Sequence, residues 1–535
     1  MSRSGFSAPL SFFFPHLFSR KDVQLKLKKF ALAMGLSLAV SAAPAFASAG
    51  FQFPKAGIAE SASLNGKTVS WQTYAKIPYV KRPSCGSCQR LTVYVPEAYL
   101  KGGTVNGYTK ETAPIFLPNS VGGYMPGDIA DPRKPNFDGG ESALLAALAR
   151  GYVVVSPAIR GRTTKNAAGR YVGKAPALIV DYKAAVRYLR AVKNELPVGN
   201  TDRIISDGTS AGGALSVLLG STGNDPRYLP YLKKIGAAKA RDDIFAAIVF
   251  CPITLLSHAD EAYEWVFKDE TVYHQGKIPG GMMQPPKAVG NGAAPAARPD
   301  NAPTEAAAGL PLSGKQIAAS KVLAREFPAT LNRFGLKDAD GKSLTLKADG
   351  TGSFADYIRS LYIASAEGAL KSGADISRFK CLTVKDGHVT AIDMKAYAKE
   401  VNRLKPVPAF DWFDAGSGEN DEFRTVKNTP RHFTAFSCAR DPKHHAMAPA
   451  KEIALLDPFT SISRKDVTVA SHFRIRHGFE DRDTVLAVPA SVALKLAEKG
   501  SDVDFAVKWG KGHAGDYDLD SMFDWADGVV KKAAK

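Results

Sequence analysis

The chain has 535 residues, of which 45% are hydrophobic and 23% are charged. This composition excludes wholesale disorder, and the length exceeds what one domain core normally reaches, so we expect two structural units or one core with a large insertion. No apolar run of about 18 or more residues follows the N-terminal segment, which excludes a multi-span membrane protein. The formal net charge is +18, but no nucleic-acid motif accompanies it, so we expect neither a nucleic-acid nor a membrane partner.

Residues 1–47 have the pattern of an export signal. Three lysines between residues 26 and 29 precede the apolar stretch Phe30–Val40, which is too short to span a bilayer. Ala45-Phe46-Ala47 then offers small residues at the positions that a signal peptidase reads. We therefore predict cleavage after Ala47 or Ala49 and a periplasmic or extracellular protein.

Export permits disulfides, and five cysteines leave at least one thiol unpaired in a monomer. Cys85-Gly-Ser-Cys88 follows Pro83 in a loop-forming stretch, which favours a local structural disulfide over a redox or zinc site. The sequence leaves the pairing of Cys251, Cys381 and Cys438 open.

The first half of the chain alternates short apolar runs with helical patterns. The runs predict strands at Pro114–Leu117, Tyr152–Ser156, Arg203–Ser206 and Ala246–Phe250, and the patterns between them predict helices at Ala143–Ala149 and Asp181–Lys193. Strands that alternate with helices are typical of a mostly parallel sheet with helices on both faces.

After Pro252 this alternation stops. Gln284–Gly314 is rich in Pro, Ala and Gly and predicts a loop. Helices are expected near Gly314–Arg325, Phe354–Ser372 and Lys395–Arg403. The alternation then returns, with predicted strands at Phe473–Arg476 and Val503–Trp509 and predicted helices at Val488–Glu498 and Leu519–Lys532. We therefore expect a core made of residues 48–250 and 455–535, with residues 251–454 inserted between its two parts as a lid domain.

The strongest chemical signal is Gly208-Thr-Ser-Ala-Gly212, between a predicted strand and an apolar helix start. A tight strand-to-helix turn needs small residues, because a Cβ at 208 or 212 would collide with the neighbouring strand and helix. Such a turn exposes the serine hydroxyl above a helix N-terminus, whose free N–H groups stabilise a developing anion. The pattern predicts Ser210 as the nucleophile of an α/β-hydrolase fold.

A serine nucleophile needs a base and an orienting acid, and in α/β-hydrolases the chain order is Ser, acid, His. The last histidine, His513, follows the predicted strand ending at Trp509. The acid should lie in the loop after strand Phe473–Arg476, which holds Glu480, Asp481 and Asp483. Composition does not choose among these three.

An oxyanion formed at the serine needs two backbone donors. We expect the N–H of Ala211 to supply one. The other should come from the loop after Leu117, where paired glycines let the backbone approach a substrate, at Val121 or Gly122.

Together the motifs resemble the bacterial tannases, α/β-hydrolases that cleave galloyl esters. The matching segments are spread over most of the mature chain: Gly208–Gly213, Cys251–Thr254, His258–Trp265, Lys405–Asp411, Glu419–Asn420, Arg476–Thr484 and His513. The resemblance implies a secreted serine esterase that uses an acyl-enzyme, acts on tannins and simple gallates, and needs no metal or organic cofactor.

The resemblance also assigns site residues. It implies that Asp481 is the acid of the catalytic triad and that Asp483, Lys405 and Glu419 bind the phenolic hydroxyls. Ile253 would pack against the ring face. One departure from the family is Gly418, where a proline often precedes the glutamate, so the apolar wall on that side of the ring differs.

Three alternatives remain open from the sequence. A feruloyl or other aryl esterase would differ only in the ring pocket. A serine peptidase shares the Ser-x-Gly-Gly turn but usually carries a large N-terminal gate domain, and a non-catalytic binding protein on this fold would normally have lost a triad member.

His444-His445 near Asp441 is better explained as a loop than as a metal site, because adjacent histidines do not easily point at one ion. The oligomeric state is left open.

Overall fold

The computed structural model describes residues 50–136, 139–197, 199–274 and 309–533. The predicted export signal with its cleavage positions, and most of the predicted loop Gln284–Gly314, lie outside these residues. Residues Phe51–Lys535 form one compact unit. Among the helices that the structure describes, none has the length and apolar character needed to cross a lipid bilayer.

The unit is built on a nine-stranded sheet with the strand order β1-β2-β3-β5-β4-β6-β7-β12-β13. The strands are β1 (Ile58–Leu64), β2 (Lys67–Pro78), β3 (Arg90–Pro96), β4 (Pro114–Pro118), β5 (Val153–Pro157), β6 (Asn200–Thr209), β7 (Ala246–Phe250), β12 (His472–Gly478) and β13 (Asp502–Lys508). All neighbours from β5 to β13 are parallel, whereas β1, β2, β3 and β5 pair antiparallel.

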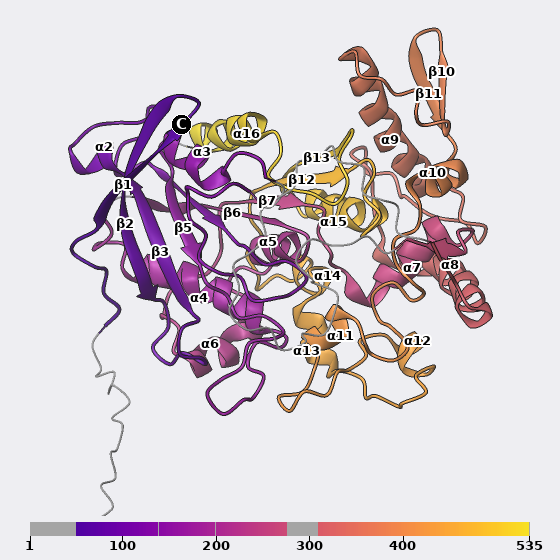
Figure 1. Ribbon diagram of the computed structural model, residues 1–535, viewed down its shortest axis with the longest axis horizontal. Coiled ribbons are helices and arrows are strands. Elements are labelled where there is room, and N and C mark those ends of the chain that lie inside the picture. The colour runs from indigo at the N-terminus through magenta and orange to yellow at the C-terminus, as the bar shows by residue number, and fades with distance from the viewer. Residues whose placement is uncertain (1–49, 137–138, 198, 275–308, 534–535) are drawn as a thin grey trace, which may run out of the picture. The chain divides into compact units, whose positions relative to one another are not determined.

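Helices cover both faces of the parallel part. Every residue of β4, β5 and β7 is buried, which explains why these strands are continuous apolar runs. The covering helices are α3 (Ala143–Ala149), α4 (Ala177–Ala191), α5 (Ala211–Ser221), α6 (Leu229–Ile235), α15 (Ala487–Glu498) and α16 (Leu519–Lys532), with the short α2 (Glu97–Leu100) and a 3-10 turn at Pro226–Tyr228 beside them. Helix α3 packs with α16 and α4 packs with α5 (Figure 1). The mostly parallel α/β-hydrolase sheet expected from the sequence is thereby confirmed.

A long segment, residues 251–471, connects the adjacent strands β7 and β12. It contains α7 (Leu256–Phe267), α8 (Gly314–Phe334), α9 (Ser353–Lys371), α10 (Met394–Val401), α11 (Gly418–Glu422), α12 (Ala435–Cys438), α13 (Ala450–Leu455), α14 (Phe459–Ile462) and the strand pairs β8 (Val272–Tyr273) with β9 (Leu310–Pro311) and β10 (Leu382–Lys385) with β11 (His388–Ile392). Figure 1 shows α7 to α10 and the β10–β11 hairpin on the side of the sheet where β12 and β13 lie. These elements share the compact unit with the sheet.

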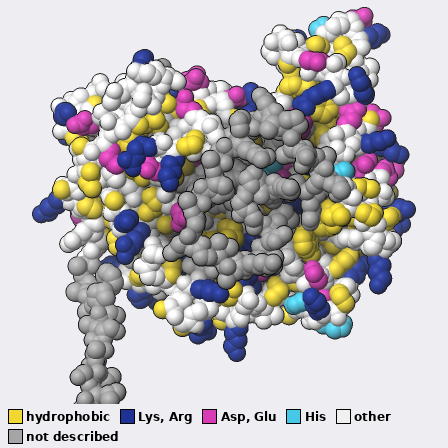
Figure 2. All heavy atoms as spheres, in the orientation of Figure 1, with side chains coloured by type: hydrophobic (Ala, Val, Ile, Leu, Met, Phe, Trp, Pro, Cys, Tyr) yellow, Lys and Arg dark blue, Asp and Glu magenta, His cyan; other side chains and the backbone are white. Residues whose placement is uncertain are grey.

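Cys85 and Cys88 form the predicted local disulfide. The other three cysteines are free thiols: Cys251 and Cys381 are buried, and Cys438 is partly exposed. On the visible face, lysine and arginine side chains are dispersed among acidic ones (Figure 2), as expected for a solvated mixed surface.

Candidate active site

The turn from β6 to α5 holds Ser210 in a strained backbone conformation, with φ 62° and ψ −122°. The surrounding glycines are required by packing. A Cβ on Gly208 would strike the backbone of Gly212, and one on Gly212 would lie 2.6 Å from the side-chain oxygen of Asn119. The turn therefore presents the Ser210 hydroxyl at the start of α5, as the sequence predicts.

His513 lies between Ser210 and Asp481. Its Nε2 is 2.8 Å from Ser210 Oγ, and its Nδ1 is 2.9 Å from Asp481 Oδ2. Glu480 instead pairs with Arg378 at the surface, and the Asp483 backbone N–H donates to Asp481 Oδ1. Of the three acids that the sequence left open, the geometry selects Asp481 as the partner of His513.

The electrostatics suit this arrangement. Burial opposes protonation of His513, but the charge of Asp481 above all, with smaller contributions from Cys251 and Asp483, outweighs it and holds the pKa of His513 well above its ordinary value. Burial likewise opposes ionisation of Asp481, yet His513 and His477 lower the pKa of Asp481 below its usual range. Asp481 is therefore an anion that stabilises a positive charge on His513.

Two further buried side chains lie next to Ser210, His513 and Asp481. The sequence motifs gave neither of them a role in the site. His477 Nδ1 lies 3.6 Å from Asp481 Oδ2, and burial lowers the pKa of His477 to about 4, so its ring is neutral at pH 7. The Cys251 thiol donates to the carbonyl oxygen of Ala514, next to His513, and burial raises the pKa of this thiol. Both side chains shield the acid–base pair from water.

Asn119 joins the predicted oxyanion loop to the serine turn. Its Nδ2 donates to the carbonyl oxygens of Asp207 and Gly212, at 2.9 and 3.1 Å. Its Oδ1 accepts from the N–H of Val121 at 3.3 Å, so that donor is already paired. Within the described part of the chain, the N–H groups of Gly122 and Ala211 have no such acceptor. The geometry therefore favours Gly122 over Val121 as the second donor.

Ile253 and Tyr124 lie beside the serine turn. Ile253 is buried, its N–H donates to the carbonyl oxygen of Ser210, and its own carbonyl oxygen accepts from the Tyr124 hydroxyl at 2.8 Å. Burial and then the charges of Glu419 and Glu422 raise the pKa of Tyr124 well above its ordinary value.

Tyr263 on α7 joins the backbone of Lys405 to the acid loop. The Tyr263 hydroxyl accepts from the N–H of Lys405 at 3.3 Å and donates to the carbonyl oxygen of Arg482 at 2.9 Å, next to Asp483. Lys405 is buried, with Nζ 4.1 Å from the ring centroid of Phe410. One tyrosine thus holds the backbone of Lys405 and that of Arg482, the residue before Asp483.

Arg162 fills the space next to Gly418, the departure from the family pattern. A Cβ on Gly418 would lie 3.2 Å from the Arg162 guanidinium carbon. Arg162 pairs with Asp421 on α11 at 2.7 Å and donates to the carbonyl oxygen of Gly123 at 2.9 Å. The arginine therefore ties the helix that carries Glu419 to the oxyanion loop.

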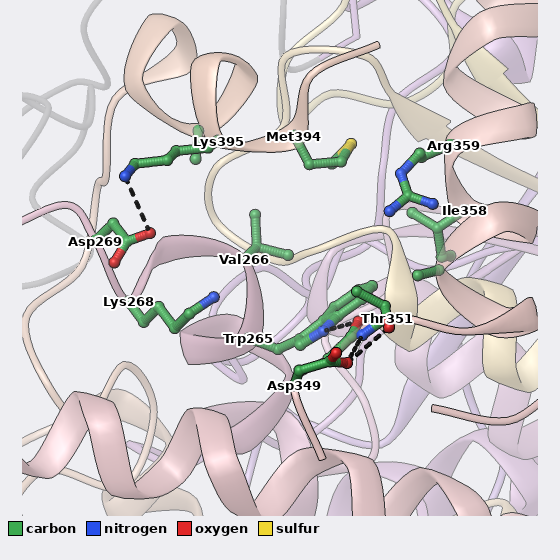
Figure 3. A pocket seen from close by; sticks show the side chains of 13 residues that line it. Trp265, Val266, Lys268, Asp269, Asp349, Thr351, Ile358, Arg359, Met394 and Lys395 are labelled. Carbon is green, nitrogen blue, oxygen red and sulfur yellow. Dashed lines mark hydrogen bonds and ion pairs between the residues drawn. The ribbon is translucent and has the colours of Figure 1, made fainter. Parts of the chain in front are cut away.

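A separate cavity of about 140 Å³ lies in the connecting segment (Figure 3). Its lining includes Trp265, Ile358 and Met394, but none of the residues predicted for the site and no serine, cysteine or histidine. It therefore lacks the Ser–His or Cys–His pair that covalent ester hydrolysis uses.

The chain is similar to known ester hydrolases. Residues 120–280 match the esterase family BD-FAE. Tannase from Fusobacterium nucleatum is 42% identical, with a TM-score of 0.82 over 90% of this chain and 99% of that chain. Tannase from Lactobacillus plantarum is 41% identical, with a TM-score of 0.82 over 89% and 98%. A tannin acyl hydrolase in complex with ethyl gallate is 40% identical, with a TM-score of 0.80 over 89% and 97%. No match was found among curated protein sequences.

Identity of this size over nearly the whole length of both chains extends well beyond the serine turn. The chain therefore belongs to the bacterial tannase family of α/β-hydrolases, and the protein is a carboxylic ester hydrolase.

Proposed function

We propose that the protein hydrolyses galloyl esters through a serine acyl-enzyme. The observation that carries the proposal is the pair of contacts from His513, at 2.8 Å to Ser210 Oγ and 2.9 Å to Asp481 Oδ2. A hydroxyl is a weak nucleophile unless a base takes its proton, and this geometry supplies the base and the group that orients it.

In the proposed mechanism, His513 Nε2 accepts the proton of Ser210 as Oγ attacks the ester carbonyl carbon. The N–H groups of Ala211 and Gly122 stabilise the oxyanion, and Asp481 stabilises the imidazolium. His513 then gives the proton to the departing alcohol. Water, deprotonated by the same nitrogen, attacks the acyl-enzyme and releases the free acid.

The ring pocket is proposed to consist of Lys405, Glu419 and Asp483, with Ile253 against the ring face. A galloyl ring carries three adjacent hydroxyls, so carboxylates accept hydrogen bonds from it and an ammonium group donates one. Support comes from Tyr263, which bonds the backbone N–H of Lys405 and the carbonyl oxygen of Arg482, the residue before Asp483. Further support comes from the Tyr124 hydroxyl, which bonds the carbonyl oxygen of Ile253. Buried groups built to pair hydroxyls discriminate against rings that lack them.

The test compares methyl gallate, methyl ferulate and a short aryl acetate. We expect the highest kcat/KM on methyl gallate and a loss of at least about 10³-fold in Ser210→Ala with the fold intact. Comparable turnover by the alanine variant would refute the serine mechanism. A preference for ferulate would favour the aryl esterase alternative, which shares the triad and differs in the ring pocket. Export is proposed from residues 1–47 alone, and N-terminal sequencing of the secreted protein tests it.

A further inference from the structure

A second cluster of ligating side chains lies in the connecting segment, near α11 and α12. His432 Nε2 lies 3.2 Å from Asp441 Oδ2, and the same oxygen lies 2.7 Å from His445 Nδ1. The three ligand atoms all lie within 4.8 Å of one another. His432 and Asp441 are buried, and the side chain of His445 is 18% exposed.

A fourth side chain orients the cluster. His432 Nδ1 lies 2.7 Å from Asp411 Oδ1, which leaves Nε2 directed at Asp441. Asp411 also accepts from Asn420 Nδ2 and, through its other oxygen, from the N–H of Thr434. A carboxylate on the far nitrogen of a histidine is the usual support of a metal-bound imidazole, because it fixes the tautomer and the ring orientation.

No lysine or arginine side chain compensates the charge of the cluster. Asp411 and Asp441 are both buried and accept hydrogen bonds, Asp441 from the N–H groups of Lys443 and His445, but burying a carboxylate without a full counter-charge is costly. Among the ion pairs of the described residues, neither carboxylate meets a lysine or an arginine; their only partners are the two histidines. A divalent cation would neutralise both.

From these observations we propose that His432, Asp441 and His445 form a binding site for a divalent cation of the zinc type, with Asp411 orienting His432. Two imidazole nitrogens and one carboxylate oxygen are ligands that Zn²⁺ prefers, and the partly exposed side of His445 leaves a fourth position for water. Ligand atoms of a tetrahedral zinc site are separated by roughly 3.3 Å, so the observed separations need only a small outward movement of the His445 ring. Without a metal, a proton on His432 Nε2 or His445 Nδ1 can bridge that nitrogen to Asp441. The cation would take the place of such a proton, which is released to solvent.

Backbone hydrogen bonds hold together the two segments that carry the ligands. The N–H of His432 donates to the carbonyl oxygen of Ala446, and the N–H of Ala448 donates to that of His432. The cation would therefore join two strand-like segments that are already paired. Because Asp411 also holds Asn420, next to Glu419, the site braces α11; any effect on gallate affinity rests on the function proposed above.

The experiment uses the mature protein without a histidine tag, stripped with a chelator and then titrated with ZnCl₂. We expect one equivalent of tightly bound zinc, a rise of several degrees in the unfolding temperature, and, with Co²⁺ in place of Zn²⁺, a visible d–d absorption band. His445→Ala should weaken zinc binding at least tenfold and abolish the cobalt band.

The chain offers a matched control in His444, which is adjacent and exposed and takes no part in the cluster. His444→Ala should bind zinc like the unsubstituted protein. Equal binding by both histidine variants, or no zinc retained by the unsubstituted protein, would overturn the proposal. Binding that persists in His445→Ala but is lost in Cys251→Ala would also overturn it, because it would assign the metal to Cys251, Asp481 and His513. None of these measurements uses ester hydrolysis, so they stand apart from the test of the catalytic function.

Discussion

The Tyr263 hydroxyl donates a hydrogen bond to the carbonyl oxygen of Arg482, 219 positions later in the chain. The same oxygen atom accepts from the N–H groups of Leu404 and Lys405, at 3.2 and 3.3 Å. One phenol thus links α7, the Lys405 segment and the acid loop that carries Asp483.

Tyr263→Phe should therefore affect stability and ring binding together. It leaves a carbonyl and two N–H groups buried without this partner, which costs about 1–3 kcal/mol of unfolding free energy. We expect KM for methyl gallate to rise about three- to tenfold, with little change on an aryl acetate. Tyr188→Phe is the control, because its hydroxyl bonds Gln52 far from the site; it should lower stability without changing KM. An unchanged KM in Tyr263→Phe would contradict the linking role.

The pH dependence follows from His513. As a general base it must be neutral, and its pKa lies well above the ordinary 6.5 because Asp481 and Asp483 outweigh burial. Activity should therefore rise with pH through that raised pKa and be lost below it, with an acid limb of kcat/KM whose midpoint exceeds 6.5.

Asp483→Asn tests the cause of this shift. Removing a negative charge near His513 should lower its pKa and move the acid limb to lower pH. The measurement uses an aryl acetate, so that lost ring contacts do not interfere. Asp466→Asn, at an exposed carboxylate paired with Arg464, should leave the midpoint unchanged. A midpoint that stays or rises in Asp483→Asn would refute this electrostatic account.

The sequence predicted the parallel part of the sheet and its helices well. Ala143–Ala149, Ala246–Phe250 and Leu519–Lys532 have the bounds that their patterns predicted. A continuous apolar run marks a buried strand such as Ala246–Phe250, and Leu519–Lys532 has the periodicity of an amphipathic helix. The sequence did not predict β1 to β3. Strand β1 carries polar residues on a half-exposed edge, whereas β3 is a buried apolar run that the pattern could have revealed. The β10–β11 hairpin was also missed, although Asp386-Gly387 between them is a turn signature and both have positive φ.

For the site, a local motif was sufficient to predict a residue only where its role requires a particular local backbone conformation. Ser210 was identified because its turn requires glycines, and His513 because of its place after a strand. Asp481 could not be chosen by composition, since the selection depends on a 2.9 Å contact across 32 residues. Tyr263 gave no signal, because a tyrosine on the buried face of α7 has the same pattern as an ordinary core residue.

A buried ion pair holds the backbone of Lys405 in place. The side chains of Arg403 and Glu264 are both 0% exposed, and Arg403 Nε donates to the carbonyl oxygen of Lys405 at 2.7 Å. Glu264→Gln leaves the guanidinium buried without its counter-charge, so we expect a loss of about 3–5 kcal/mol in a denaturant titration. Asp356→Asn at an exposed pair with Arg359 should cost at most about 0.5 kcal/mol. Similar losses of unfolding free energy in both variants would show that the buried pair contributes no more to stability than an exposed one.

The last prediction concerns the packing of the His513 loop on the serine turn. A Cβ on Gly515 would overlap the side chain of Thr209, the residue before Ser210. Gly515→Ala must therefore push the loop away and lengthen the contact from His513 to Ser210, so kcat should fall about 10²-fold or more, since a displacement of about 1 Å has that effect. Gly528→Ala, in α16 with no atom within 4 Å of the new carbon, should raise stability by about 0.5–1 kcal/mol and leave kcat unchanged. Normal kcat in Gly515→Ala would mean that the loop adjusts without moving the imidazole, and that the fit between Gly515 and Thr209 does not position the base.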